Sequence, residues 1–366
     1  MRFVVARGRG CGYGGGIACS GGRLLAMAYG FGARGIRLWL AAAGVGLTAG
    51  VLASAVRSEG QEAAAARTGK FSAHQKTVNR NYYMYVPTKY TPRKRWPMII
   101  SAPGTFPFDS SPGTRDAWVD TAEELGLIIC CPDFETANGL LNIKADQAKL
   151  QRDNEAVLAV IRDVASVYSI DPNGIAVTGW SGGGYPAHYI GLKNPNLIRA
   201  IIGRTANFSE DLVDEETARK ARHMHVFCFF AKSDLAGIPE QNRRANFWYT
   251  MQGFLNFEIR EIPGGHSKNN RLAGDWFVQM LRSYPAVRIQ ASTLKGRAPL
   301  AVNFRALASD PDGRVAGHIW QFGDGGVSIH PSASHTFATP GTYNVFLTVT
   351  DNDGHHEYAQ VEVVAE

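Results

Sequence analysis

The pattern G-x-S-x-G, centred on Ser181, is the segment of this chain with the clearest chemistry. It follows an apolar run, Ile175–Thr178, and opens a segment with helical character, Gly182–Leu192. A serine on such a strand-to-helix turn exposes its hydroxyl, and Gly179 and Gly183 let the flanking backbones approach closely. The N–H groups at the start of the following helix point toward any negative charge that develops there. The spacing therefore predicts that Ser181 is a nucleophile.

A serine hydroxyl is a weak nucleophile, so a base and an acid that orients the base must lie beside it. Where such a serine stands at a strand-to-helix turn of an α/β sheet, the three residues occur along the chain in the order serine, acid and histidine. Asp234 comes directly after the apolar run Val226–Phe230, and His266 follows the last apolar run. Both are expected at the carboxyl edge of the sheet, where open α/β sheets bind ligands. His266 would then accept the Ser181 proton, and Asp234 would fix the tautomer of His266.

Other residues remain alternatives for these two partners. Asp211 and Asp214 are alternative acids, in which case the favoured aspartate would only form a turn or cap a helix. His188, His223 and His225 are alternative bases. They fit the role less well than a loop histidine, because the first lies in the expected helix after the nucleophile and the others precede or begin a strand.

The negative charge of a tetrahedral intermediate needs two backbone N–H donors, an arrangement called an oxyanion hole. One donor is expected from Gly182, directly after the nucleophile. The other is expected from the loop after the strand Met98–Ala102. We predict Thr105 as this second donor, with Gly104 as the alternative. Losing one such donor typically costs about 3–4 kcal/mol in the activation barrier.

Aromatic side chains near the expected strand ends are candidates for an acyl-binding pocket. For any one of them, packing in the core is the more common role, because aromatic side chains dominate protein interiors. The four predicted substrate-binding residues are Phe106, Trp180, Tyr185 and Phe208, with Phe108 and Phe134 as further candidates.

Between residues 81 and 284, short apolar runs alternate with segments of helical periodicity. Several runs are almost continuously apolar, which is typical of strands covered on both faces. Strands that alternate with helices predict an α/β domain with a doubly wound, mostly parallel sheet. The expected strands are Tyr82–Val86, Met98–Ala102, Leu127–Cys131, Ile175–Thr178, Ala200–Ile202, His225–Phe230 and Phe257–Ile262.

The pattern changes after Pro285, where helical periodicity ends and glycine, aspartate and proline separate short alternating runs. Residues 286–366 therefore predict a small all-β sandwich. They contain W-Q-F-G-D-G at 320–325, H-T-F at 335–337 and P-G-T-Y at 340–343. These segments resemble the polycystic-kidney-disease (PKD) family, with Gln321 in place of the usual aspartate. No metal is predicted, because turn formation explains the carboxylates that could hold calcium: Asp310, Asp312, Asp324 and Asp353.

Residues 81–284 resemble the α/β-hydrolase superfamily. The matching segments are Y-V-P at 85–87, I-D-P at 170–172 and the elbow at 179–184. They look most like the secreted esterases grouped with polyhydroxyalkanoate depolymerases and with feruloyl or acetyl-xylan esterases. The resemblance implies serine hydrolysis of carboxylic esters without a metal or organic cofactor. Family members usually have His-Gly in the oxyanion loop, whereas this chain has Pro103-Gly104, so the choice between Gly104 and Thr105 stays open.

The amino-terminal segment carries the basic excess of the chain. The formal net charge is +6, from 38 basic and 32 acidic residues. Residues 1–37 contain six arginines, no lysine and no acid, which leaves 32 basic against 32 acidic residues in the remainder. The remainder is balanced, so a strong nucleic-acid-binding field is not implied.

The uncharged run Leu38–Val56, with small residues at its end, predicts that residues 1–56 form a signal peptide cleaved near Ala55. A membrane anchor is the alternative, because the run is long enough to span a bilayer. Residues 57–80 are expected to be a linker. Cys130, Cys131 and Cys228 lie in apolar runs and are interpreted as buried hydrophobic residues rather than as a disulfide framework or zinc site.

These observations together predict a secreted or periplasmic serine esterase with a Ser-Asp-His triad, or a membrane-anchored one. Polysaccharide-linked esters and polyesters are the candidate substrates, and the PKD-like domain is expected to be a spacer or a contact to a polymer or cell surface. Two alternatives remain. One is a serine peptidase of the prolyl-oligopeptidase type, and the other is a non-catalytic surface-binding protein that acts through the PKD-like domain.

Overall fold

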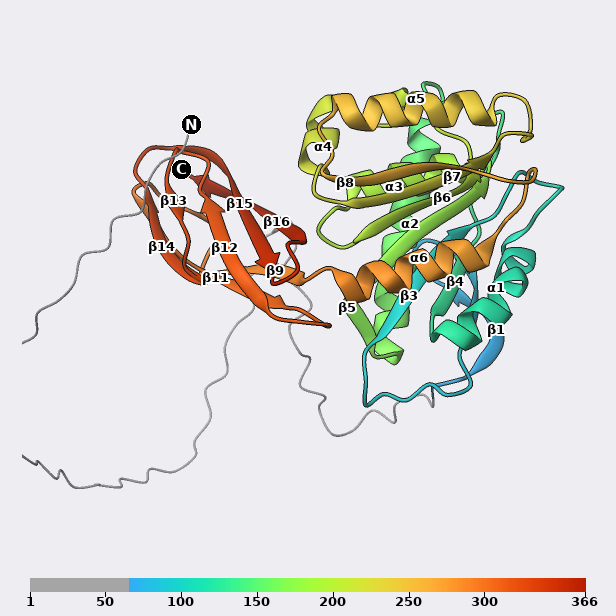
Figure 1. The fold of residues 1–366 in the computed structure, drawn as a ribbon, viewed down its shortest axis with the longest axis horizontal. Helices are drawn as coiled ribbons and strands as arrows, with labels where there is room; N and C mark the ends of the chain where they lie inside the picture. The colour runs from blue at the N-terminus through green and yellow to red at the C-terminus, as the bar shows by residue number, and fades with distance from the viewer. Residues whose placement is uncertain (1–65) are drawn as a thin grey trace, which may run out of the picture. The chain divides into compact units, whose positions relative to one another are not determined.

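The computed structural model describes residues 66–366. Its α/β domain contains β1 (Gly69–Gln75), β2 (Arg80–Val86), β3 (Trp96–Ala102), β4 (Ile128–Pro132), β5 (Ile170–Ser181), β6 (Ala200–Ala206), β7 (His225–Ala231) and β8 (Asn256–Ile262). They form one sheet in the order β1-β2-β4-β3-β5-β6-β7-β8 (Figure 1). β2 pairs antiparallel with β1 and β4, and all other neighbours are parallel. The predicted mostly parallel sheet is confirmed.

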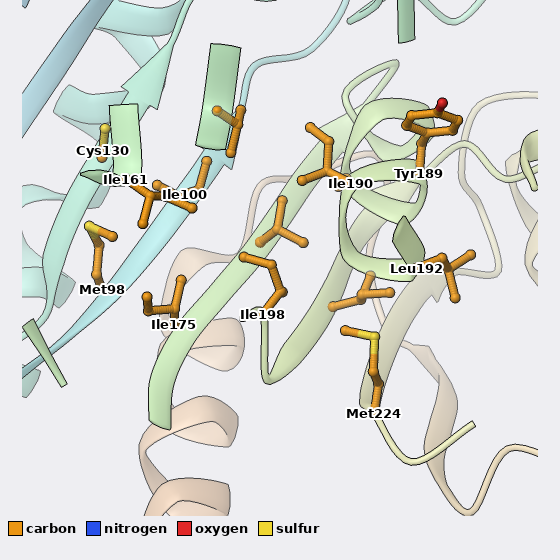
Figure 2. Packing of buried hydrophobic residues seen from close by; sticks show 14 of the residues in the cluster. Met98, Ile100, Cys130, Ile161, Ile175, Tyr189, Ile190, Leu192, Ile198 and Met224 are labelled. Atoms are coloured by element: carbon orange, nitrogen blue, oxygen red, sulfur yellow. The ribbon is translucent and has the colours of Figure 1, made fainter. Parts of the chain in front are cut away.

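Helices cover both faces of this sheet, because successive side chains of a strand point to opposite faces. In β3, Met98 and Ile100 enter one core, whereas Ile99 enters the other. Figure 2 shows part of the first core, to which the strands contribute Met98, Ile100 and Ile175 and α3 (Gly184–Lys193) contributes Ile190. The first core is covered by α2 (Gln147–Val167), α3 (Gly184–Lys193) and α5 (Ile238–Met251), and the second by α1 (Ser111–Leu125) and α6 (Asn270–Ser283).

The three cysteines of the described residues are buried and free. Cys130 and Cys228 belong to the first core, and Cys131 belongs to the second. Burial raises the pKa of the Cys131 and Cys228 thiols to about 12, which keeps them protonated and unreactive. Their interpretation as small hydrophobic residues is confirmed.

β1 corrects the expectation that residues 57–80 form a linker. It pairs with β2 along its whole length, at the edge of the sheet. Its side chains alternate in burial, with Lys70, Ser72 and His74 exposed. Phe71 and Ala73 pack against the first core from the other face. An edge strand that is half polar has no continuous apolar run, which is why the sequence pattern did not reveal it.

Residues 286–366 form two small sheets around a third core, as predicted for a β-sandwich (Figure 1). Trp320 is fully buried in this core. At the turn that follows, Asp324 accepts the Gly326 N–H at 3.0 Å and lies 2.7 Å from His335 Nε2. The strands are β9 (Ala286–Ala291), β10 (Lys295–Gly296), β11 (Leu300–Ser309), β12 (Val315–Gln321), β13 (Val327–Ser328), β14 (Ser332–Phe337), β15 (Gly341–Asp351) and β16 (His356–Ala365).

The signal peptide or anchor expected at residues 1–56 lies outside the described residues, so its export function stays a prediction. Within residues 66–366, no helix has the length and apolar character needed to cross a bilayer. In the same part of the chain, no three His, Cys, Asp or Glu side chains are grouped so that they could hold a metal ion.

Candidate active site

The turn from β5 into α3 holds Ser181 in a strained backbone conformation. Its φ is 51°, in the left-handed region that residues other than glycine rarely adopt. A Cβ atom on Gly179 would lie 2.0 Å from the Gly183 carbonyl oxygen, and one on Gly183 would lie 2.2 Å from the Pro103 carbonyl oxygen. Only glycine therefore fits at these two positions, and the tight turn lifts Ser181 to the carboxyl edge of the sheet.

Asp234 and His266 meet at this edge. Asp234 lies just after β7, and its carboxylate oxygen is 2.6 Å from Nδ1 of His266. The carboxylate also accepts the N–H groups of Ala231 at 3.1 Å and Leu235 at 2.8 Å, and no part of its side chain is exposed. A carboxylate oxygen accepts, so Nδ1 donates, which leaves Nε2 of the neutral ring free to accept a proton.

The His266 ring lies beside Trp180, the residue that precedes Ser181. The centroids of the His266 and Trp180 rings are 5.0 Å apart, with an angle of 30° between their planes. Within residues 66–366, no hydrogen bond joins Ser181 to His266. In ligand-free sites this bond is often long and tightens only when substrate is bound. The structure thus joins Asp234 to His266 and places the imidazole next to the Ser181 turn.

The loop after β3 lies against the same turn. A Cβ atom on Gly182 would lie 2.5 Å from Thr105 Oγ1, so the two backbones approach closely. Thr105 Oγ1 accepts the Gly139 N–H at 2.8 Å, which ties this loop to the one after β4. The Gly104 N–H donates to Asp109 Oδ2 at 2.9 Å, whereas the Thr105 N–H has no acceptor within the described part of the chain. This geometry favours Thr105 over Gly104 as a donor to a ligand.

The four predicted substrate-binding residues separate into two pairs. Phe106 is 81% exposed, directly after Thr105, and Trp180 lies against His266. Tyr185 and Phe208 are corrected, because both are buried in the first core. Nearly every residue of α3 is buried, Tyr185 among them, and Phe208 packs on the rings of His188, Trp248 and Tyr249.

The alternative acids have other surroundings. Asp214 is the N-cap of α4 (Glu215–Lys220) and accepts the Thr217 N–H at 2.7 Å; hydrogen bonds from the Thr217 side chain and this N–H lower its carboxyl pKa. Asp211 lies in the short 3-10 helix Glu210–Leu212. Neither of them contacts His266 in the described residues, whereas Asp234 does.

The alternative bases are also placed elsewhere. His223 and His225 lie just before and at the start of β7, and the carboxyl end of that strand is the one near Asp234. His188 is fully buried in α3, and its Nδ1 lies 2.7 Å from the Tyr249 hydroxyl. Burial lowers the pKa of His188 from 6.5 to about 3, so the ring stays neutral in the core.

This shift predicts a dependence of stability on pH. Between about pH 6.5 and about pH 3 the unfolded state binds a proton at His188 that the folded state does not. The free energy of unfolding therefore falls as the pH falls through this window, by at most about 1.4 kcal/mol per unit from this group. Urea unfolding at several pH values should show a shallower dependence in His188→Gln. An unchanged dependence would contradict the assignment of a neutral buried histidine.

Two residues near the site were not identified from the sequence. Lys268 Nζ lies 2.8 Å from Asp109 Oδ1, and Asp109 is nearly buried. Burial alone would raise the carboxyl pKa of Asp109, but hydrogen bonds from the Gly104 N–H and Lys268 outweigh it and hold the pKa below its usual value. The only feature of the sequence that could have indicated this ion pair is that Lys268 follows His266 by two residues.

A third missed residue, Arg204, is fully buried in β6. Its guanidinium donates to Thr178 Oγ1 at 3.0 Å and Ser101 Oγ at 2.9 Å, and also to Asn270. These partners come from β5, β3 and α6, so one side chain links the elements next to the loops that carry Ser181, Thr105 and His266. Burial lowers the pKa of Arg204 to about 10, which still leaves it charged.

Comparison with known proteins identifies the carboxyl-terminal domain. Residues 284–365 match the family model of the PKD domain, which confirms the resemblance. The chain is 36% identical to the microbial collagenase of Vibrio alginolyticus over 61 residues, which are 16% of this chain and 8% of that protein. The chain therefore spans less than a tenth of that curated relative.

Two solved structures of esterases are similar to the larger part of the chain. S-formylglutathione hydrolase from Staphylococcus aureus is 14% identical with a TM-score of 0.45, over 58% of this chain and 99% of that one. A ferulic acid esterase from Anaeromyces mucronatus is 19% identical with a TM-score of 0.46, over 61% of this chain and 92% of that one.

Proposed function

We propose that the α/β domain is a serine hydrolase that cleaves carboxylic esters through Ser181, His266 and Asp234. The observation that supports this most is the buried Asp234 carboxylate, 2.6 Å from His266, at the edge of the sheet where Ser181 stands in a left-handed turn. A histidine oriented by a buried carboxylate beside a strained serine is the arrangement that activates a hydroxyl nucleophile.

In the first half of the reaction, Ser181 Oγ attacks the carbonyl carbon of the ester, and its proton passes to Nε2 of His266. The carbonyl electron pair moves to oxygen, where the N–H groups of Thr105 and Gly182 stabilise the negative charge. The bond to the alcohol oxygen then breaks, and His266 returns the proton to that oxygen. The products of this half are the free alcohol and an acyl group on Ser181.

In the second half, His266 takes a proton from water, and the resulting hydroxide attacks the acyl carbon. The bond to Ser181 Oγ breaks, the proton returns to that oxygen, and the carboxylic acid leaves. Asp234 stabilises the positively charged imidazole in both halves without taking its proton.

Exposed apolar side chains beside the site support a water-insoluble ester as substrate. Phe106 and Phe108 are 81% and 86% exposed, and Leu140 is 91% exposed. Phe106 follows Thr105, Leu140 follows Gly139 and the exposed Leu235 follows Asp234, so all belong to the loops of the site. Burying such side chains against an apolar polymer surface is favourable by about 2 kcal/mol for each that is fully covered. Among the candidate substrates, this favours polyesters.

The double variant Phe108→Ser, Leu140→Ser should separate polymer binding from chemistry. We expect hydrolysis of an insoluble polyester film to fall at least about tenfold, because two side chains that are even partly covered by the film together lose at least about 1.4 kcal/mol of surface binding. The kcat/KM for p-nitrophenyl acetate should stay within about twofold of the wild type. A matched control is Phe247→Ser, Met251→Ser, which removes two side chains of α5 that are 68% and 66% exposed. Equal losses on the film for both double variants would contradict the proposal.

The proposed function itself is tested by comparing substrates of different bond types with the purified chain. We expect p-nitrophenyl acetate and butyrate to be hydrolysed, and peptide p-nitroanilides to be cleaved far more slowly. Cleavage of the peptides alone would favour a peptidase, and no cleavage of either kind would favour a binding protein that acts through the PKD domain.

We also propose that the chain is exported and that the PKD domain is a spacer or a contact to a polymer or cell surface. The uncharged run at residues 38–56 supports export. Amino-terminal sequencing of protein recovered from the medium should find a start close to residue 56. Recovery of the full-length chain in the membrane fraction would instead favour an anchor.

A further inference from the structure

An ion pair that the reaction above does not use connects two loops of the site. Lys268 Nζ lies 2.8 Å from Asp109 Oδ1, with 24% of the lysine side chain and 5% of the aspartate side chain exposed. Asp109 ends the loop that carries Thr105, and Lys268 belongs to the loop that carries His266. The two residues are 159 positions apart in the chain, so only the fold brings them together.

The second carboxylate oxygen of Asp109 acts on the oxyanion loop. Oδ2 accepts the Gly104 N–H at 2.9 Å and the Thr114 hydroxyl at 2.8 Å. The hydrogen bond to Gly104 uses the N–H that immediately precedes that of Thr105. It fixes the orientation of this segment of backbone and leaves the Thr105 N–H as the one available to a ligand.

The Trp180 indole lies between the elements that the pair connects. A Cβ atom on Gly104 would lie 2.6 Å from Trp180 Cε3, so the ring rests directly on the oxyanion loop. The same indole lies against the His266 ring, tilted by 30°, and Lys268 Nζ lies 4.9 Å from the centroid of the Trp180 ring. A cation at this distance is attracted to the ring face.

We propose that Asp109 is a positioning residue, which holds the Thr105 N–H in the oxyanion hole and, through Lys268, holds the His266 loop against Trp180. This inference rests on the proposed ester hydrolysis. The contribution is made through backbone geometry, because Asp109 itself contacts neither the nucleophile nor the base in the described structure. A misplaced oxyanion donor mainly weakens binding of the transition state, so its loss lowers kcat more than it raises KM.

The first test is the kinetics of Asp109→Ala and Asp109→Asn on p-nitrophenyl acetate. In Asp109→Ala we expect kcat to fall about a hundredfold, with KM within about threefold of the wild type, as for loss of one oxyanion donor. In Asp109→Asn we expect a fall of about tenfold at most, because the amide oxygen can still accept the Gly104 N–H. A kcat within about threefold of the wild type in Asp109→Ala would overturn the inference.

Inhibition by a trifluoromethyl ketone separates a positioning role of Asp109 from a purely structural one. The serine hydroxyl adds to the carbonyl carbon of this ketone, and the resulting oxyanion lies in the oxyanion hole, as in the tetrahedral intermediate. We expect its inhibition constant to rise in Asp109→Ala by about the same factor as kcat/KM falls. An unchanged inhibition constant, together with a large loss of kcat, would overturn the proposed role.

If Asp109→Ala does not fold, Lys268→Met still tests the inference, because it leaves the hydrogen bond from the Gly104 N–H to Asp109 in place. In Lys268→Met we expect kcat to fall about tenfold. Lys268→Arg retains the positive charge and the N–H donors, so we expect it to keep most of the wild-type kcat. Lys232→Met, at an exposed lysine two residues before Asp234, is the matched control and should behave as the wild type. Equal activities of Lys268→Met and Lys232→Met would overturn the coupling through Lys268. An inactive wild type would instead refute the proposed ester hydrolysis.

Discussion

Ser181→Ala should lower kcat for p-nitrophenyl acetate by roughly a millionfold. The methyl group cannot form the acyl intermediate, so only binding and oxyanion stabilisation remain to assist attack by water. The fold should persist, because alanine and serine meet the same backbone strain at a φ of 51°. Stopped assays with high enzyme concentrations and thermal unfolding of the same sample measure the two expectations together.

The nearby serine at position 267 gives a matched control. It follows His266 and is exposed, and its backbone oxygen, rather than its hydroxyl, accepts the bond from Thr205 at 3.1 Å. We therefore expect Ser267→Ala to retain activity within about twofold. If Ser181→Ala keeps near wild-type activity while remaining folded, Ser181 is not the nucleophile.

Asp234→Asn should lower kcat about ten-thousandfold with little effect on KM. In the wild type, Nδ1 of His266 lies 2.6 Å from a carboxylate oxygen of Asp234. In the variant, the amide that replaces this carboxylate would present an N–H donor to Nδ1. The ring would then carry its proton on Nε2 and could not accept one from Ser181. The loss should be seen in steady-state kinetics across a range of pH values.

Asp211→Asn is the control for this variant, because Asp211 is the exposed alternative acid. We expect it to retain activity within about twofold. Loss of activity in Asp211→Asn, with Asp234→Asn unaffected, would show that Asp234 is not the acid that orients the catalytic base.

The architecture could be predicted because each of its signals is local in the sequence. A strand buried on both faces must be apolar at nearly every position, as in β3 and β7, and this is visible without a structure. The elbow could be predicted because Gly179 and Gly183 stand at fixed offsets from Ser181, even though the contact that requires Gly183 is with the Pro103 carbonyl of another loop. The order of serine, acid and histidine then indicated Asp234 and His266, which the structure brings together.

Features set by packing between distant segments could not be predicted in this way. Tyr185 lies near the expected site along the chain, but α3 is buried almost completely between its neighbours, so Tyr185 enters the core. The contact between Asp109 and Lys268 depends on the approach of two loops, and no residue spacing records it. β1 was missed because an edge strand buries only one of its faces, so its apolar residues are too few to form a run.

The central claim is that Ser181 is a nucleophile activated by His266 and Asp234, and covalent labelling tests it most directly. The purified chain is treated with a fluorophosphonate, and mass spectrometry locates the adduct. We expect one phosphonyl group per chain, on the peptide that contains Ser181, with much slower labelling in Asp234→Asn. Absence of an adduct, or an adduct on another residue while ester hydrolysis stops, would contradict the account.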